Sequence, residues 1–243
     1  MKHVAALLFL VACGGGGSSP NNGGGGDDDG SNGTTPDAAK PAAQMLKFSG
    51  VTQENTQSGA TPLAGVTMAL YANGSDSSPL GMATSDASGN YSFSVDDHGA
   101  AIDGYMKASK SGYVDNFIYP AAAFSTDQTA ANANLVTTDN FNYLGLLGSQ
   151  QSGKGLVVVE ILDSSDQSVA GATLSSMPAA GSVKYMDNGI PTGTSGTDTD
   201  GAAFLFNVPP GSVTISAAKS GMTFKSHALT AHADAFTTTV IGQ

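Results

Sequence analysis

The chain has 243 residues, a net charge of −11, no arginine and no tryptophan, and only nine lysines. The seven lysines after residue 45 are too scattered to form a basic patch, and binding to nucleic acid needs clustered cations that displace counterions from phosphates. This composition argues against a nucleic-acid partner. Hydrophobic residues make up 40% of the chain, which is enough to fill a folded core.

The first 13 residues have the features of an export signal. A short basic start precedes an eight-residue apolar run, Val4 to Val11. This run is too short to cross a bilayer, which takes about 20 residues, but it has the length of a signal-peptide core. The run ends in Leu-Val-Ala-Cys, residues 10–13, which resembles the lipobox of bacterial lipoproteins.

That resemblance implies a signal peptide at residues 1–12 and a lipid on Cys13, with a diacylglyceryl thioether on its sulfur and an acyl chain such as palmitate on its amine. The alternative is a free cysteine behind an ordinary signal peptide. Cys13 is the only cysteine, so the mature chain cannot form an internal disulfide. Two or more acyl chains anchor a protein stably. Gly14, where an aspartate marks retention at the inner membrane in lipoproteins, implies the outer membrane, on its periplasmic face or at the cell surface.

Residues 13–45 are expected to form a disordered tether. Gly14 to Gly33 holds ten glycines, and three aspartates interrupt them at residues 27–29. Such a composition buries no apolar surface and predicts a flexible coil with a reach of about 30 Å. We interpret the aspartates as a solvated spacer rather than a metal site. Proteases should cleave this tether first.

Three segments of the remaining chain recur in the same order and at nearly constant spacing. The matching pairs are 62–68 with 168–174, 85–89 with 197–201, and 108–112 with 217–221. Apolar residues around them alternate with polar ones, which predicts strands, and both Asp-x-x-Gly segments predict hairpin turns. The pattern indicates two copies of one β domain, at 46–137 and 154–243.

The first copy resembles the carboxypeptidase regulatory-like domain. The resemblance rests on Pro-Leu-Ala-Gly-Val-Thr at 62–67, Thr-Ser-Asp-Ala-Ser-Gly-Asn-Tyr-Ser-Phe at 84–93 and Ala-Ser-Lys-Ser-Gly-Tyr at 108–113. The second copy matches more loosely, with Ala172 in place of a β-branched residue and a longer insertion before its Asp-x-x-Gly turn. The resemblance implies a prealbumin-like Greek-key sandwich, a carbohydrate-binding-like fold. The predicted fold class is therefore all-β, with two tandem Greek-key β-sandwiches of prealbumin or immunoglobulin type.

Residues 138–153 are predicted to form a short helix and a linker between the copies. Thr138 and Asp139 are suitable N-caps, and Phe141, Leu144 and Leu147 form an apolar stripe at helical spacing; a loop is the alternative. The linker is Gly-Ser-Gln-Gln-Ser-Gly at 148–153. We expect the two copies to be separate, metal-independent folding units.

The sequence lacks the motifs of a hydrolase. Outside the signal peptide its histidines are His98, His227 and His232, and neither a His-Glu-x-x-His nor a Gly-x-Ser-x-Gly motif occurs. A zinc peptidase needs such ligands and a general base, and a serine hydrolase needs an activated serine. We therefore predict that the protein is not an enzyme and that it has no catalytic residue and no cofactor.

Three groups of residues were weighed as metal ligands, and for each another interpretation is preferred. Asp96, Asp97 and His98, with Asp103 nearby, are interpreted as a solvated turn. Asp198 and Asp200 resemble the start of a calcium loop, but its twelfth position is a proline, so a hairpin is preferred. His227 and His232 are five residues apart and face opposite sides of a regular strand.

An intramolecular isopeptide bond was also considered, because some bacterial surface sandwiches contain one. Lys47, Lys110 and Lys219 are candidates by residue type only. The scarcity of glutamate, which occurs only at positions 54 and 160, argues against this bond.

Two functions fit these features. The first is a non-catalytic, lipid-anchored envelope protein that acts as a scaffold or adhesive module. The second is a carbohydrate-binding module that stacks sugars on exposed aromatic rings. Its candidate residues are the closely spaced Tyr105, Tyr113, Phe117 and Tyr119, for which packing of two strands is the alternative. The expected partners are the membrane, through the lipid, and a glycan or another envelope protein.

Overall fold

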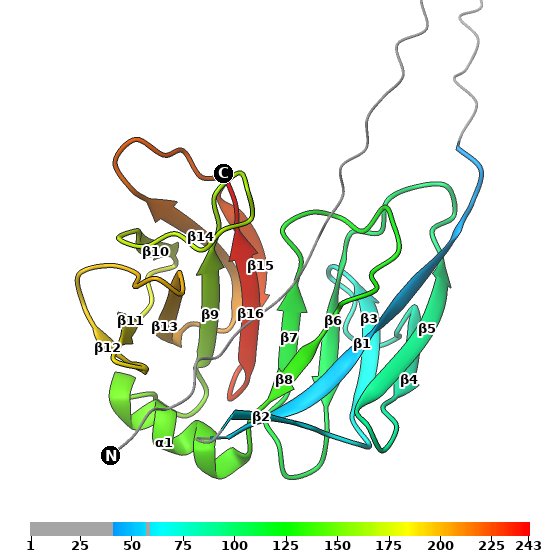
Figure 1. Ribbon diagram of the computed structural model, residues 1–243, viewed down its shortest axis with the longest axis horizontal. Coiled ribbons are helices and arrows are strands. Elements are labelled where there is room, and N and C mark those ends of the chain that lie inside the picture. Colours follow the sequence, from blue (N-terminus) through cyan, green and yellow to red (C-terminus); the bar gives the residue numbers. More distant parts are fainter. Residues whose placement is uncertain (1–40, 57–58) are drawn as a thin grey trace, which may run out of the picture.

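The computed structural model describes residues 41–56 and 59–243, which form 16 strands and one helix. Cys13 and the tether up to residue 40 lie outside the described residues. The prediction of an all-β fold of sandwiches with a short helix between two halves is confirmed (Figure 1). No helix of the described part of the chain is long and apolar enough to cross a bilayer.

The first half is a sandwich of two layers. One layer contains β1 (Met45–Thr56), β2 (Gly59–Pro62), β5 (Asn90–Asp96) and β8 (Ala133–Leu135). The facing layer contains β3 (Thr67–Ala72), β4 (Gly81–Thr84), β6 (Gly104–Ser109) and β7 (Asn116–Tyr119). The apolar residues that alternate along these strands pack between the layers, with Phe48, Met68 and Leu70 fully buried.

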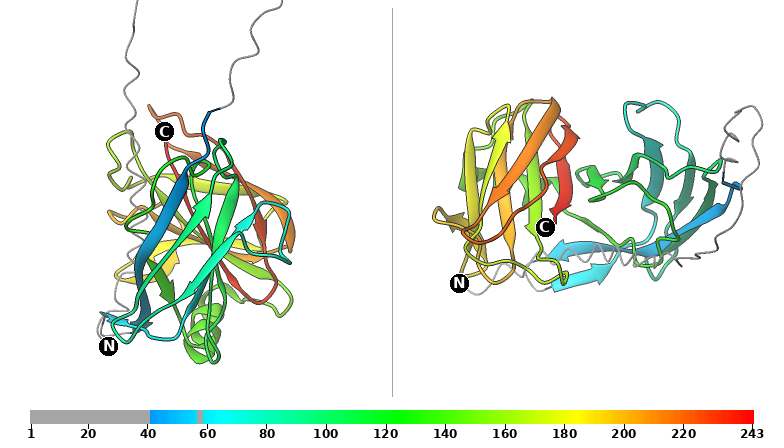
Figure 2. Two further views of the ribbon diagram at one scale, coloured as in Figure 1. Left: turned by 90° about the vertical axis from the view of Figure 1, so that its right-hand side faces the viewer. Right: turned by 90° about the horizontal axis from the view of Figure 1, so that it is seen from above.

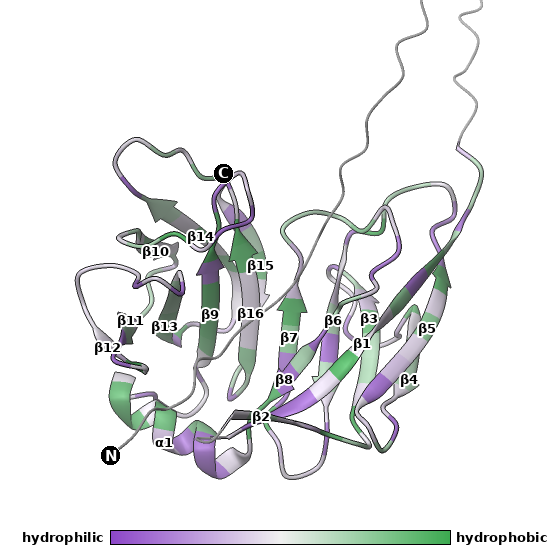
Figure 3. Ribbon diagram, in the orientation of Figure 1, coloured by the Kyte–Doolittle hydropathy of each residue, from purple (hydrophilic) through white to green (hydrophobic). Residues whose placement is uncertain are grey.

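The second half is also layered. One layer contains β9 (Gly155–Ile161), β11 (Ser182–Asp187), β12 (Ile190–Gly193), β13 (Ala202–Val208) and β16 (Phe236–Ile241). The other contains β10 (Thr173–Met177), β14 (Gly211–Ala218) and β15 (His227–Ala231). Four consecutive residues of β9, Leu156 to Val159, are fully buried. This continuous apolar run indicates a strand covered on both faces, and Figure 3 shows the hydrophobic character of β9 and β13.

The two halves share one sheet. β16 runs parallel to β9 on one side and to β7 of the first half on the other. The resulting sheet has nine strands, in the order β12-β11-β13-β9-β16-β7-β6-β3-β4. The sequence did not predict this junction, because pairing between distant strands leaves no local pattern. The division into copies at 46–137 and 154–243 stays a prediction, but main-chain pairing crosses between them.

The covering layers lie on opposite faces of the shared sheet. Phe117, Thr237 and Val157 are in register across β7, β16 and β9, so their side chains share one face. His232, which follows β15, packs against Phe117 on that face. Phe236 lies one position from Thr237 and points to the other face, where Phe141 of the helix contacts it. The view from above in Figure 2 shows the two halves side by side.

The helix α1 (Thr138–Gly148) begins one residue earlier than the sequence suggested. Its N-cap is Thr137, whose side chain accepts a hydrogen bond from the Asn140 N–H at 3.3 Å; the caps predicted at Thr138 and Asp139 are wrong. Thr137 is the residue with extended backbone, and the helical turn begins directly after it. Phe141 is buried, as the predicted stripe requires, whereas Leu146 is 76% exposed.

Both copies build the same turn around a buried hydroxyl. Ser85 Oγ donates to the Leu63 carbonyl at 2.9 Å and accepts from the Val66 N–H at 3.0 Å. Thr197 Oγ1 donates to the Val169 carbonyl at 2.6 Å and accepts from the Ala172 N–H at 3.0 Å. These three residues of each copy occupy matching positions of the repeat, so the repeat read from the sequence is confirmed at the level of hydrogen bonds.

The Asp-x-x-Gly segments form turns, but the predicted hairpins are wrong. Gly89 donates to the Asp86 carbonyl, and Gly201 donates to the Asp198 carbonyl, both at 2.9 Å. The strands β4 and β5 around the first turn belong to different sheets, and β11 lies between β12 and β13 around the second. The two strands that flank each turn do not pair with each other. Each of them pairs with a different strand instead, so the turn connects non-adjacent strands and is not a hairpin.

Candidate functional site

At the junction between the halves, side-chain hydrogen bonds and stacked aromatic rings lie together. Thr238 Oγ1 bonds to Asn116 Oδ1 at 3.1 Å, and Thr239 Oγ1 donates to the Tyr119 carbonyl at 3.0 Å. Asn116 also donates from Nδ2 to the Asn134 carbonyl at 3.1 Å. These side-chain bonds supplement the main-chain ladder between β7 and β16. A buried polar group is stable only when it is paired, so this pairing ties the halves together.

The aromatic residues singled out in the sequence meet at this junction. Tyr105, Phe117 and Tyr119 are buried, and the Tyr105 ring stacks on Tyr119 with centroids 4.9 Å apart. Tyr71 stacks on the other side of Tyr105 at 5.5 Å. Packing of strands, the alternative to sugar stacking, is therefore confirmed for these three rings. Their faces contact one another and the second half.

Tyr113 is the member of that group that stays half-exposed. Its hydroxyl donates to Glu54 Oε2 at 2.7 Å, and this bond together with burial raises the pKa of Tyr113 to about 12. Lys110 Nζ lies 5.6 Å from the centre of the Tyr113 ring. The ring is thus held at the rim of the junction, with its polar tip fixed to β1.

His232 is the second half's contact with these rings. Its imidazole stacks on Phe117, with centroids 3.5 Å apart and planes 6° from parallel. Its Nε2 is shielded from solvent and has no hydrogen-bond partner among the described residues. Burial lowers the pKa of His232; the charge of Asp76 opposes this shift, Lys107 adds to it by a smaller amount, and Asp115 opposes it least. The neutral imidazole therefore fits this contact best.

Charged side chains of the first half surround the rings. Lys107 Nζ pairs with Asp115 Oδ2 at 2.7 Å and lies 5.0 Å from the centre of the Phe117 ring. The Tyr105 hydroxyl donates to Asp76 Oδ1 at 2.6 Å. Burial, with this bond as a second cause, raises the pKa of Tyr105. These groups belong to β6, β7, the segment before β7 and the loop between β3 and β4, so the second half meets charged side chains around an aromatic centre.

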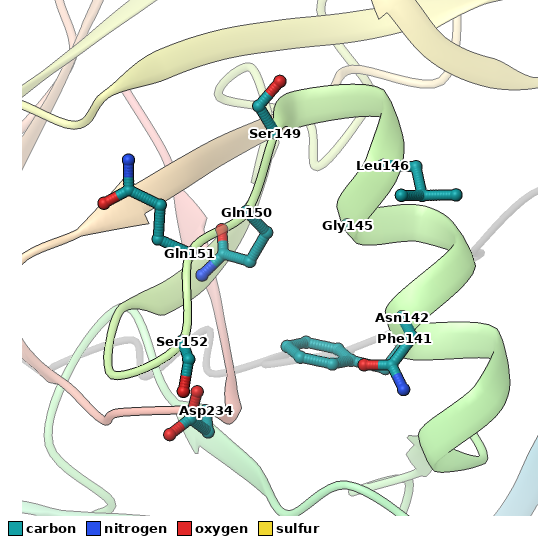
Figure 4. A pocket seen from close by; sticks show the side chains of 9 residues that line it. All are labelled: Phe141, Asn142, Gly145, Leu146, Ser149, Gln150, Gln151, Ser152 and Asp234. Atoms are coloured by element: carbon teal, nitrogen blue, oxygen red, sulfur yellow. The ribbon is translucent and has the colours of Figure 1, made fainter.

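An open groove borders the junction on both sides of the Phe141 ring. One part, of about 570 Å³, lies between helix α1, the segment before β7 and the turn after β15; it is lined by Tyr113, Asp115, Phe117, Phe141, Asn142, His232 and Asp234, among others. The second part, of about 460 Å³, lies between α1 and the segment after it. Figure 4 shows this part, with Phe141, Gln150 and Asp234 around it.

The wall of the groove is the segment predicted as the linker, and hydrogen bonds hold it in place. Gln150 Nε2 donates to the Lys154 carbonyl at 3.0 Å, and its Oε1 accepts from the Asn207 N–H at 2.8 Å. Asn207 Oδ1 accepts from the Gln151 N–H at 2.6 Å, and Asp234 Oδ1 accepts from the Gly153 N–H at 2.8 Å. The linker is therefore a fixed loop.

Polar side chains also line the groove. Asn142 is exposed on α1, Gln151 and Ser152 follow the helix, and Asp115 and Asp234 stand on the two halves. Amides, a hydroxyl and carboxylates beside aromatic rings are groups that bind neutral or cationic polar molecules. The sequence reasoning missed Gln150, Asn207 and Asp234. The signal for Asn207 was an amide inside the apolar run of β13, where it sits with φ of 57° at a register shift.

The residues weighed as metal ligands do not converge in the described part of the chain. No group of three His, Cys, Asp or Glu side chains there is placed to hold an ion. His98 is exposed with φ of 52° and lies 3.4 Å from Asp96, as expected of a turn. Asp97 is buried instead, and its Oδ1 accepts from the N–H groups of Gln44 and Gly99.

Asp198, Asp200 and the two other histidines also serve local structure. Asp200 Oδ1 accepts from the Ala202 N–H at 3.0 Å, and burial raises the pKa of Asp200. His227 and His232 stand at the two ends of β15, and burial lowers the pKa of each. Lys110 was a candidate for an isopeptide bond. Its Nζ donates a hydrogen bond to the main-chain carbonyl of Ala64, not to an asparagine side chain.

No protein-family model and no curated protein sequence matches this chain. Among solved structures it is similar to the Bacillus anthracis TIE protein, with 14% identity, 81% of this chain and 34% of that chain covered, and a TM-score of 0.26. It spans about a third of that protein.

It is also similar to two pilins. For the shaft pilin SpaA from Lactobacillus rhamnosus GG the identity is 11%, with 82% of this chain and 98% of the pilin covered and a TM-score of 0.27. For GBS52, the minor pilin of Streptococcus agalactiae, the identity is 13%, with 81% and 94% covered and a TM-score of 0.28. At such scores the likenesses assign no family and no function.

Proposed function

We propose that this chain is a non-catalytic, lipid-anchored module of the bacterial cell envelope, in which two β-sandwiches act as one rigid unit on a tether. The observation that carries the proposal is the pairing of β16 with β7, which continues one sheet through both halves. Two domains on a flexible linker reorient freely, whereas a shared sheet, an aromatic centre and a fixed loop transmit position and load. That is the requirement for a scaffold or an adhesive module.

Spin-label distances test the rigidity. Cys13 is the only cysteine, so the Cys13→Ser chain can be labelled at two introduced cysteines alone. Ser92→Cys in the first half and Ser220→Cys in the second replace exposed residues, and the two labels report one distance between the halves. We expect a single narrow distribution. A broad distribution, as wide as that of a flexible linker, would overturn the rigid unit. Phe117→Ala in the same background should broaden the distribution.

The anchor is tested separately at Cys13. The wild-type chain should incorporate a labelled fatty acid and fractionate with the outer membrane, because the lipobox resemblance implies lipidation and Gly14 implies export past the inner membrane. Cys13→Ser should abolish the label and leave unprocessed precursor. Normal processing and membrane retention of that variant would contradict the anchor without affecting the rigidity argument.

A carbohydrate-binding function is the second candidate, and the groove at α1 favours it. Amide and carboxylate groups there stand beside the rings of Tyr113 and Phe141, the combination that orients sugars. A glycan array probed with the full chain should show a ligand that Asn142→Ala or Tyr113→Ala weakens. Tyr143→Ala is the control, since Tyr143 is on the same helix but does not line the groove. Equal loss in all three variants, or no glycan bound, would count against this function.

A further inference from the structure

The carboxylate of Asp234 lies where the two parts of the groove beside α1 meet. Asp234 lines both parts, as do Phe141 and Asn142, and Figure 4 labels all three around one of them. Its Oδ1 accepts from the Gly153 N–H at 2.8 Å. Within the part of the chain that the structure describes, no cation pairs with this carboxylate and no donor bonds to its Oδ2. Asp234 is exposed, so a ligand in the groove can reach this oxygen.

The charges along the groove favour a cation. The second carboxylate, Asp115, already pairs through Oδ2 with Lys107 Nζ at 2.7 Å, and no lysine of the described chain lines either part. His232 also lines one part, and burial lowers its pKa, which favours the neutral imidazole. A cleft lined by charge of one sign concentrates ligands of the opposite sign, and the net charge of −11 acts in the same direction.

The uncharged groups of the groove suit a ligand with several hydroxyls. Asn142 and Gln151 expose amides that both donate and accept hydrogen bonds, and Ser152 adds a hydroxyl. The half-exposed ring of Tyr113 is fixed at the rim, because its hydroxyl bonds to Glu54. The two parts, of about 570 and 460 Å³, are within the size of small-molecule sites, about 300–1,000 Å³. These groups can orient a sugar whose ring packs beside Tyr113.

The groove lies far from the point where the chain enters the first half. Glu54, which holds Tyr113 at the groove, is nine residues along β1 from Met45. A strand rises about 3.4 Å per residue, so the two ends of this segment are about 30 Å apart. Figure 1 shows α1 at the bottom of the molecule and the start of β1 at the top. With the proposed anchor before β1, the groove faces away from the anchoring membrane, which favours a glycan over a lipid headgroup of that membrane as the ligand.

We propose that this groove binds a sugar with a protonated amino group, such as a β-1,4-linked glucosamine chain, and that the ammonium pairs with Asp234 Oδ2. The inference rests on the carbohydrate-binding function proposed above and names the class of sugar. The ammonium supplies the ion pair that Asp234 lacks, and a hydrogen bond between two charged groups is stronger than one between neutral groups. Hydroxyls of the sugar bond to Asn142 and Gln151. Asp115 contributes less than Asp234, because Lys107 already pairs with it.

Titration calorimetry of the full chain with four probes tests the amine and the sugar separately. The β-1,4-linked trimers of glucosamine, N-acetylglucosamine and glucose differ only at C2, and trilysine carries the charge of the first trimer without a sugar ring. The glucosamine trimer should bind at least about tenfold tighter than the other three, and its affinity should fall as salt rises.

The unfavourable outcomes are distinguishable. Equal affinity for the three sugars would overturn the role of the amine and leave the carbohydrate-binding function standing. Trilysine that binds as tightly as the glucosamine trimer would overturn the sugar as the ligand. If none of the three sugars binds, both this inference and the carbohydrate-binding function lose their support.

Asp234→Asn tests the assigned contact. Asparagine can still accept from the Gly153 N–H and tolerates the φ of 53° at this position, so the loop should keep its structure. The variant should weaken the glucosamine trimer about tenfold and change the affinity for the N-acetylglucosamine trimer by less than about twofold. Asp139→Asn is the matched control, since Asp139 is exposed in the first turn of α1 and lines neither part of the groove. Equal loss in both variants would assign the effect to net charge and overturn the pairing with Asp234.

Discussion

The two copies keep the same local turn but use the strands after it differently. The buried hydroxyl of Ser85 in the first copy and of Thr197 in the second makes the same two main-chain bonds. The segment between the first repeated motif and that hydroxyl forms β4 in one copy and the β11–β12 pair in the other. Matching hydrogen bonds therefore preserve the corner of the sandwich, while the strands between the hydrogen-bonded residues pair differently in the two copies.

This difference explains the width of the shared sheet. In the second copy β11 and β12 extend the layer of β9 and β13, and β16 adds the edge that meets β7. The first copy adds its β4 to β3, at the other end of the same nine-stranded sheet. Both copies thus broaden the sheet that forms the junction, and β16 and β7 are the strands that meet there.

Phe117→Ala should have the largest effect, because it removes the ring on which His232 stacks. We expect a loss of about 3–5 kcal/mol, as for other buried phenylalanines, and a split of unfolding into two transitions, one for each copy. Calorimetry measures both. Leu70→Ala, inside the first sandwich, is the control and should lower stability without separating the copies. Unchanged cooperativity in Phe117→Ala would mean that the main-chain ladder alone couples the halves.

Alanine at the glycine of either Asp-x-x-Gly turn should have the next largest effect. Gly89 and Gly201 have φ of 79° and 65°, and an added Cβ would lie 2.5 Å from the Thr52 carbonyl oxygen and 2.8 Å from that of Ile161. Strain and clash together should lower stability by about 2–3 kcal/mol in each case. Gly74→Ala isolates the strain, since its φ is 77° but nothing lies near. If denaturant titrations gave the same loss of stability for all three variants, the added Cβ would not clash at Gly89 and Gly201.

Removal of the buried hydroxyl tests whether the two copies depend equally on it. Ser85→Ala and Thr197→Val each leave one main-chain N–H without its side-chain partner and remove a donor from one carbonyl, although the Leu63 carbonyl still accepts from Thr52 Oγ1. Each change should lower stability by about 1–3 kcal/mol. Ser94→Ala, exposed on β5, should change it by less than about 0.5 kcal/mol. A large loss of stability in one variant and none in the other would show that only one copy depends on its buried hydroxyl.

The smallest expected effect is the pH dependence of stability that His232 causes. Its pKa is lowered in the folded protein, so the neutral form is favoured and stability is lost as pH falls below about 6.5, the unfolded value. Since the imidazole is only half-buried, the expected loss by pH 5 is under about 1 kcal/mol, or about 2–4 °C in melting temperature. His232→Phe should flatten this dependence.

His98→Gln is the control for that experiment, because His98 is exposed and lies outside the junction. Its melting temperature should follow the wild-type profile between pH 7 and pH 5. NMR titration of the imidazoles gives the pKa of His232 directly. A value at or above about 6.5, the ordinary value for histidine, would contradict the unfavourable burial of the charged ring.

The sequence by itself determined the class of fold, the repeat and its turns. Alternating apolar residues and the Asp-x-x-Gly turns act over a few residues, so they can be read locally. The buried hydroxyl before each aspartate was not predicted, because its partners lie 19 to 28 residues away. The helix after residue 137 was predicted for the same reason, apart from a shift of one residue in its cap. Aromatic packing at Tyr105, Phe117 and Tyr119 was predicted only as one of two alternatives.

Tertiary structure alone decided the junction and the groove. The pairing of β16 with β7 joins residues about 120 positions apart, and its energy depends on main-chain groups that every residue carries, so no motif announces it. The partners of Gln150, Asn207 and Asp234 are likewise main-chain atoms of distant segments. Local sequence therefore specifies the same Asp-x-x-Gly turn in both copies. The pairing of each edge strand depends instead on how the layers pack in the folded protein.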